Sequence, residues 1–223
     1  PAARALAEAH WPGPLTLVLP RRADAGLAPA VTAGLPTVAL RAPAHPAMRA
    51  LLERLTFPLA APSANRSGFI SPTTPAHVLA SLDGRIDMVL DGGATSAGVE
   101  STIVAVRADG SVEELRPGPL QLGTRGQGKS IEAPGQLASH YAPGKPVRLG
   151  AAEAEADEFL IGFGAVAGDV TLSVSGDLDE AASRLYACLH EGANAAQPRI
   201  AVAPVPEEGV GRAINDRLRR AAA

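Results

Sequence analysis

TVALRAPAHPAMRALLERL, residues 37–55, joins two different periodicities and so decides the fold class. Its first part, Thr37 to Arg41, is a β-rich run that Pro43 closes. Its second part has apolar side chains at helical spacing, namely Met48, Leu51, Leu52 and Leu55. A strand followed directly by a helix predicts a domain of the α/β or α+β class, with helices packed on a sheet.

Strand and helix patterns also alternate on either side of this stretch. Upstream, residues 3–10 have the pattern of a helix and residues 15–19 that of a strand. Downstream, Thr74 before Pro75 is typical of a capped helix start, and the helix is predicted to run to Leu82. Further strand-like runs are 59–61, 88–90, 102–106 and 111–115.

The residues after 146 follow a simpler pattern. Strands are predicted over 146–149, 159–163 and 199–203, and helices over 177–189 and 210–218. This order predicts a small parallel α/β domain. Residues 124–146 hold glycines, prolines and both lysines with little periodicity, which is typical of a linker. The predicted domains are therefore 1–123 and 147–223, joined by the linker 124–146.

The composition excludes several classes of protein. A hydrophobic fraction of 46% over 223 residues excludes a wholly disordered chain. The single cysteine, Cys188, excludes a disulfide framework and is predicted to pack in a core. The five histidines show no metal-ligand spacing, so no metal ligand is predicted. A net charge of −3 gives no attraction to nucleic acid, and no apolar run is long enough for a membrane span. We therefore expect a cytoplasmic protein.

Two loops have the residue types of a ligand site. LAAPSANRSG, residues 59–68, turns on small and hydroxyl side chains, and Ser71-Pro-Thr-Thr74 adds hydroxyls before a helix start, where anions bind. A plain Ser/Pro loop with a helix cap is the alternative interpretation. In the glycine-rich loop 91–102, Ser101 sits at the entrance of the next strand, and a simple connection is the alternative.

Two arginines and one aromatic motif add to these loops. Arg41 and Arg116 each end a predicted strand, from where a guanidinium can bind a phosphate or a carboxylate in a bidentate manner. An exposed salt bridge is the alternative. The HYAP motif, residues 140–143, either closes over a ligand or anchors the linker. The arginines near the C-terminus predict a solvated helix end: Arg217, Arg219 and Arg220.

Taken in order, seven segments resemble the Sua5/YrdC/YciO family, and its long Sua5-type members in particular. The segments are HWPGPLTLVL (10–19), TVALRAPAHP (37–46), APSANRSGFISPTT (61–74), DGGATSAGVESTIV (91–104), LRPG (115–118), APGQLASHYAP (133–143) and GVGRAINDRLRRA (209–221). The resemblance implies a YrdC-like twisted α/β sheet domain and a small Rossmann-like C-terminal Sua5 domain. The linker between them is expected to act as a lid.

The resemblance also implies an activity. Members of the family are L-threonylcarbamoyladenylate synthases, which are nucleotidyltransferases that use L-threonine, bicarbonate and ATP, with Mg²⁺ on the ATP. Their product feeds t6A modification of tRNA at position 37 through a downstream tRNA threonylcarbamoyl transferase. Such chemistry needs no protein nucleophile, so no catalytic side chain is predicted. We expect no stable binding of nucleic acid or membrane.

The binding residues are carried over position by position. Those that fall where the family contacts ATP are Thr37, Ser63, Ser71, Arg116 and Tyr141. Those that fall where it contacts L-threonine are Arg41, Ala61 and Ser101. Asn65 and His140 lie inside matching motifs and are second choices.

One part of the family pattern is absent from this sequence. The Thr-x-Thr-Tyr-Gly-like and Lys-x-Arg segments have no match here, and we expect them upstream of Pro1. The alternative function is a non-catalytic nucleotide- or RNA-binding YrdC-like module. The related domain of hydrogenase-maturation carbamoyltransferases comes with cysteine-rich zinc segments, which a chain with one cysteine lacks.

Overall fold

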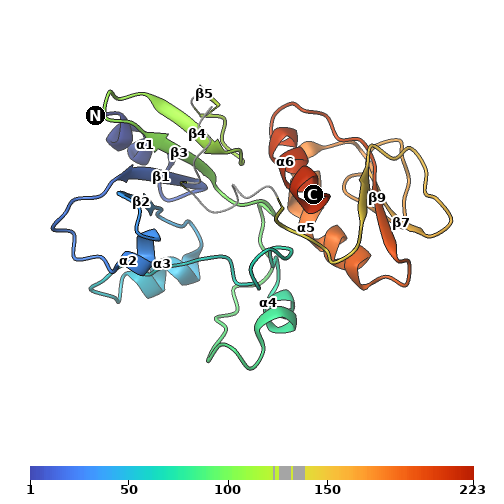
Figure 1. The fold of residues 1–223 in the computed structure, drawn as a ribbon, viewed down its shortest axis with the longest axis horizontal. Coiled ribbons are helices and arrows are strands. Elements are labelled where there is room, and N and C mark those ends of the chain that lie inside the picture. Colours follow the sequence, from blue (N-terminus) through green and yellow to red (C-terminus); the bar gives the residue numbers. More distant parts are fainter. Residues whose placement is uncertain (123, 126–131, 133–138) are drawn as a thin grey trace. The chain divides into compact units, whose positions relative to one another are not determined.

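The computed structural model describes residues 1–122, 124–125, 132 and 139–223, which pack as two compact units (Figure 1). Unit 1 is built from Pro1–Ala61 and Glu100–Gln136, and unit 2 from Pro62–Val99 and Leu137–Ala223. The predicted sequence domains 1–123 and 147–223 stay a prediction. Most of the predicted lid, 124–146, lies outside the described residues.

Unit 1 contains a five-stranded mixed sheet with the order β2-β1-β3-β4-β5. Parallel pairing joins β1 to β3 and β4 to β5, and the other neighbours are antiparallel. The strands are β1 (Leu15–Pro20), β2 (Thr37–Leu40), β3 (Thr102–Val106), β4 (Val112–Arg116) and β5 (Thr124–Arg125). The helices are α1 (Ala2–His10), α2 (Pro29–Thr32) and α3 (Pro46–Leu52).

The central strands of unit 1 are buried because apolar side chains point to both of their faces. Leu15, Leu17 and Val104 lie on one face and pack with Leu6 of α1 and with Trp11. Val18, Ile103 and Ala105 form a second cluster. Every residue of β3 is buried, which is typical of a strand in the middle of a sheet.

Unit 2 contains the fully parallel sheet that the sequence predicts, with the order β6-β9-β7-β8. Its strands are β6 (Val147–Leu149), β7 (Glu158–Gly162), β8 (Val170–Thr171) and β9 (Arg199–Val202). Its helices are α4 (Pro75–Leu82), α5 (Leu178–Asn194) and α6 (Gly211–Ala221). The fold is thus of the α/β class, as predicted.

One hydrophobic core holds α5 and α6 against the sheet of unit 2. Leu185 and Leu189 of α5 and Ile214 of α6 share this core with Ile161 and Val202 of the strands. The predicted caps explain where two helices begin. Asp177 Oδ1 accepts the backbone N–H of Glu180 at 2.7 Å, and Thr74 Oγ1 accepts that of His77 at 3.3 Å.

Four local predictions are wrong. Residues 59–61 and 88–90 form no strand, because they are exposed and pair with no neighbouring strand; Met88 is 82% exposed. The helix predicted to reach Leu55 ends at Leu52 in α3. Arg217 is not solvated: it is fully buried, although Arg219 is exposed as expected.

No helix among the described residues has the length and the apolar character that a membrane crossing requires.

Candidate functional site

Ser101 and Arg116 form the centre of the candidate site in unit 1. Ser101, only 3% exposed, precedes β3, and its Oγ lies 2.7 Å from Thr16 Oγ1 and 3.2 Å from Arg116 Nη2. The Ser101 carbonyl oxygen accepts hydrogen bonds from Arg116 Nη2 at 2.9 Å and Nε at 3.2 Å. These contacts fix the orientation of the guanidinium of Arg116, a residue that is only 8% exposed.

The LRPG turn and strand β1 hold this centre together. A Cβ atom at Gly118 would overlap the backbone of Thr102, so the turn needs glycine to approach β3 this closely. Thr16 was missed by the sequence analysis. The available signal was a hydroxyl side chain inside the buried run Leu15–Leu19, where an isolated polar group needs a partner.

Arg41 is a second cation in the same unit. It directly follows β2, and its Nε donates to the Gly13 carbonyl oxygen at 3.2 Å. Partial burial of the guanidinium lowers the pKa of Arg41, and the positive charge of Arg116 lowers it further. Two arginines that repel each other favour an anion beside them, because a carboxylate or a phosphate relieves the repulsion.

Two further predicted residues belong to unit 1. Thr37 begins β2, opposite Pro20. It shares a face of the strand with Arg41, and at ~3.3 Å per residue the two positions are about 13 Å apart. Ala61 is exposed in a segment without regular structure. Unit 1 therefore holds Arg116 on Ser101 and brings the charge of Arg41 near that of Arg116. The contacts predicted for Thr37 and Ala61 stay predictions.

Unit 2 joins the HYAP motif to the Ser-rich loop. The backbone N–H of Ala142 donates to Gly68 O at 2.8 Å, and Phe69 forms an isolated β-bridge with Ala142. Asn65 Nδ2 stabilises the same turn, because it donates hydrogen bonds to the carbonyl oxygens of Arg66 and Phe69, at 2.8 and 3.0 Å. Ser63 is exposed on this loop.

Tyr141 and Ser71 are buried parts of unit 2. Tyr141 is 1% exposed, and its ring centre lies 5.5 Å from that of Tyr186 and 4.2 Å from that of His140. Ser71 is also buried, and its carbonyl oxygen lies 3.2 Å from His190 Nε2. The nucleotide contacts predicted for Tyr141, Ser63 and Ser71 stay predictions.

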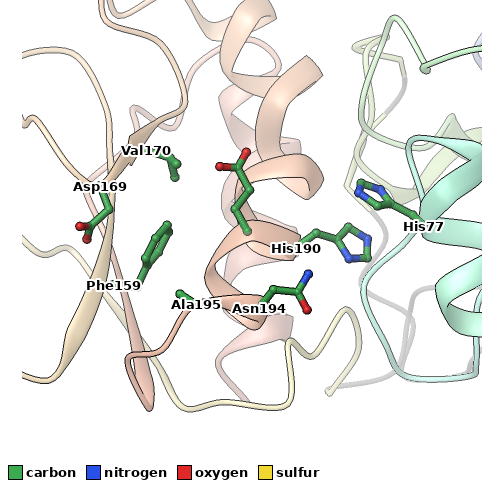
Figure 2. Close-up of a pocket in the computed structure, with 8 residues that line it drawn as sticks. His77, Phe159, Asp169, Val170, His190, Asn194 and Ala195 are labelled. Carbon is green, nitrogen blue, oxygen red and sulfur yellow. The ribbon is translucent and has the colours of Figure 1, made fainter.

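A cavity of about 480 Å³ lies beside His190, and Figure 2 shows the imidazoles of His77 and His190 facing each other there. The ring centres are 3.8 Å apart and the planes differ by 26°, so the rings stack. Burial lowers the pKa of both histidines, and the nearby His77 lowers that of His190 further. No pattern in the sequence marked this pair, because α4 and α5 are far apart along the chain.

Two other expectations concern metals and thiols. Among the described residues, no group of three or more His, Cys, Asp or Glu side chains is arranged to hold a metal ion. Cys188 is buried in the core of unit 2, as predicted, and burial raises the pKa of its thiol. A buried thiol of this kind is chemically inert.

Comparison with known proteins places the whole chain among one group of sequences. Residues 1–118 match the Sua5/YciO/YrdC family profile described as telomere recombination. Residues 100–223 match the profile described as threonylcarbamoyl-AMP synthase, C-terminal domain.

Individual relatives align over nearly the whole chain. The threonylcarbamoyl-AMP synthase of Bacillus subtilis is 37% identical over 99% of this chain and 72% of its own length. That of Pyrococcus abyssi is 35% identical over 98% of this chain and 73% of its own length. The crystal structure of P. abyssi Sua5 complexed with L-threonine superposes with a TM-score of 0.86, at 33% identity, over 99% of this chain and 73% of that one.

Proposed function

The chain belongs to the Sua5-type threonylcarbamoyl-AMP synthase family, and we propose that it makes threonylcarbamoyl-AMP and pyrophosphate from L-threonine, bicarbonate and ATP. The observation that carries this proposal is the guanidinium of Arg116 held on Ser101, with the charge of Arg41 near it in unit 1. All three substrates are anions or carry a carboxylate, and two neighbouring guanidinium groups are suited to bind them.

The two arginines have different surroundings, which supports different roles. Arg116 is buried and held by the backbone of Ser101, so it presents a fixed charge, which we assign to ATP. Arg41 is more accessible and makes one hydrogen bond to a backbone carbonyl, so we assign it to the carboxylate of threonine. The Ser101 hydroxyl adds a directed polar contact to the amino acid.

The reaction needs positioning more than side-chain chemistry. The threonine amine attacks the carbon of bicarbonate or CO₂ and forms a carbamate, with loss of water when bicarbonate reacts. A carbamate oxygen then attacks the α-phosphorus of ATP, and pyrophosphate leaves with the electrons of the broken P–O bond. Fixed arginines and hydroxyls lower the barrier by neutralising charge and aligning the groups.

Mg²⁺ on the triphosphate would neutralise part of the ATP charge. Because the described residues supply no cluster of three metal-binding side chains, we assign no protein ligand to this ion. The proposed product is a mixed anhydride, which a tRNA threonylcarbamoyl transferase would consume downstream. A cytoplasmic location is part of the same proposal.

The test is the dependence of pyrophosphate release on each substrate. We expect the full-length protein to release pyrophosphate from ATP only when L-threonine and bicarbonate are both present. L-serine and L-2-aminobutyrate serve as matched amino acids, because the first lacks the methyl group of threonine and the second lacks its hydroxyl group. Equal release without threonine would contradict the proposal. ATP binding without any release would favour a non-catalytic nucleotide-binding module.

A further inference from the structure

The histidine pair consists of His77 in α4 and His190 in α5. Both side chains contact the Ser71–Thr74 segment. His190 Nε2 lies 3.2 Å from the Ser71 carbonyl oxygen. His77 Nδ1 lies 3.3 Å from both the backbone nitrogen and the Oγ1 of Thr73. Ser71 and Thr73 are buried, so these contacts determine where their backbone lies.

The hydrogen-bond partners define the protonation state of each ring. A carbonyl oxygen only accepts, so His190 needs a hydrogen on Nε2 to bond Ser71. A backbone N–H only donates, so His77 needs a bare Nδ1 to bond Thr73. Protonation of His77 at Nδ1 would turn the acceptor into a donor and break the bond to Thr73.

Stacking makes the pair sensitive to charge. With ring centres 3.8 Å apart, two imidazolium ions would repel each other strongly. Asp169 and Glu191 are the charged side chains that line the cavity beside the pair. In Figure 2, Phe159 lies between Asp169 and the two imidazole rings. Asp169 is already engaged, because its Oδ2 accepts the backbone N–H of Leu160 at 2.7 Å. Lys145, at the C-terminal end of α5, donates to Gly192 O and Ala195 O.

We propose that His77 and His190 are positioning residues that hold the Ser71–Thr74 segment for the nucleotide, and that they do so only while His77 is neutral. The inference rests on the proposed function, because that function makes Ser71 a nucleotide contact. It adds a role for α5, whose residue His190 reaches the carbonyl oxygen of Ser71, 119 residues away in the sequence. Acidification should release the segment and weaken ATP binding.

Matched substitutions separate hydrogen bonding from packing. His190→Gln keeps a donor near the position of Nε2, whereas His190→Phe keeps a ring but no donor. His77→Asn keeps an acceptor near the position of Nδ1 and does not titrate, whereas His77→Ala removes it. At pH 7.5 we expect the Phe and Ala variants to raise KM for ATP roughly three- to tenfold with kcat unchanged. The Gln and Asn variants should stay within about twofold.

The pH profile tests the titration. The phosphates of ATP also titrate near neutral pH. The readout is therefore the ratio of KM for ATP in wild type to that in His77→Asn, measured from pH 7.5 to 5.5. We expect this ratio to rise as the pH falls, because only wild type loses its acceptor. His10→Gln, in α1 of unit 1, is the control and should follow wild type.

A constant ratio, or equal KM values in the Phe and Gln variants, would overturn the inference. Hydrogen exchange of the Thr73 amide gives a readout without ATP: it should speed up in His77→Ala and not in His77→Asn. Threonine-dependent pyrophosphate release together with unchanged KM values would contradict the positioning role alone. Altered Thr73 exchange without any threonine-dependent release would contradict the proposed function alone.

Discussion

The guanidinium carbon of Arg217 lies 5.8 Å from the centre of the Tyr141 ring, and both side chains are buried in unit 2. Tyr141 has a φ of 63°, in the left-handed region that tyrosine rarely adopts. Arg217 Nη1 donates to Asp216 Oδ2 at 3.3 Å, and Asp216 also accepts from Arg220 Nε. Helix α6 thus supplies a buried cation that packs on the ring of the HYAP motif.

The first prediction is that Arg217→Met destabilises unit 2. Methionine restores much of the volume but removes the cation from the Tyr141 ring and from Asp216, which keeps Arg220 as a partner. We therefore expect a loss of about 1–3 kcal/mol in the free energy of unfolding, less than for a carboxylate left without any cation. Urea denaturation followed by circular dichroism measures it.

Arg219→Met is the matched control on the same helix. Its guanidinium is exposed and pairs with the exposed Glu207, so its removal should change the free energy of unfolding by less than about 0.5 kcal/mol. Equal changes in the free energy of unfolding for the two substitutions would show that burial of the Arg217 cation does not stabilise unit 2.

Arg217 also shows where sequence reasoning stops. Periodicity and caps predicted α5, α6 and the parallel sheet, because burial of an apolar stripe and an N-cap are local properties. An arginine near a helix C-terminus is normally solvated, so nothing in the sequence marked Arg217 as buried. The stack of His77 on His190 depends on tertiary packing and was equally invisible.

The candidate site was predicted only in part, because local features are visible in a sequence and tertiary contacts are not. Strand ends are visible in a sequence, and Arg41 and Arg116 do lie at the ends of β2 and β4. The runs 59–61 and 88–90 have strand-like composition, but a strand also needs a neighbour that accepts its hydrogen bonds. No pattern within a three-residue run reveals whether that neighbour exists.

The second prediction concerns the glycine-rich loop. A Cβ atom at Gly98 would overlap the Ala182 carbonyl oxygen and the Ser183 backbone of α5, and Gly98 has a φ of +68°. We expect Gly98→Ala to lower the free energy of unfolding by about 2–5 kcal/mol, because backbone strain and steric overlap add. Thermal unfolding measured by calorimetry checks the size of the effect.

Gly93→Ala provides the comparison within the same loop. Gly93 has a φ of +78°, but no atom lies within 4 Å of the added Cβ. We therefore expect Gly93→Ala to lower the free energy of unfolding only by the cost of placing alanine in the left-handed region, about 1–2 kcal/mol. A loss at Gly98 no larger than that at Gly93 would mean that the loop does not pack closely on α5.

The third prediction is an acid dependence of stability set by Glu158. Arg148 Nη2 donates to Glu158 Oε2 at 2.5 Å, and this bond lowers the pKa of Glu158 to about 2. The folded-state pKa is below the unfolded value of about 4.3, so the stabilisation is present above that pH. It is lost as the pH falls from about 4.3 towards 2. Stability measured in urea across this window should decrease.

Glu158→Gln should flatten this part of the pH profile, because glutamine does not titrate. Glu153→Gln removes the same charge from an exposed position in the preceding segment and should leave the slope unchanged. An identical slope in wild type and Glu158→Gln would assign the acid dependence to other carboxylates.

The last prediction separates the roles of the two arginines at the candidate site. Arg41→Ala should weaken L-threonine binding roughly ten- to a hundredfold and leave ATP binding nearly unchanged, because it removes the cation assigned to the amino-acid carboxylate.

Arg116→Ala should weaken ATP binding by a similar factor. It also leaves the buried Ser101 carbonyl oxygen without its guanidinium donors, so its free energy of unfolding must be measured alongside. Arg116→Lys keeps the charge but loses the bidentate geometry, so it should bind ATP with intermediate affinity. Calorimetric titration of each of the three variants with each of the two ligands separately gives six affinities. Normal binding of both ligands by both alanine variants would show that the assigned roles are wrong, and a loss of both ligands in both variants would mean that the arginines act as one shared anion site.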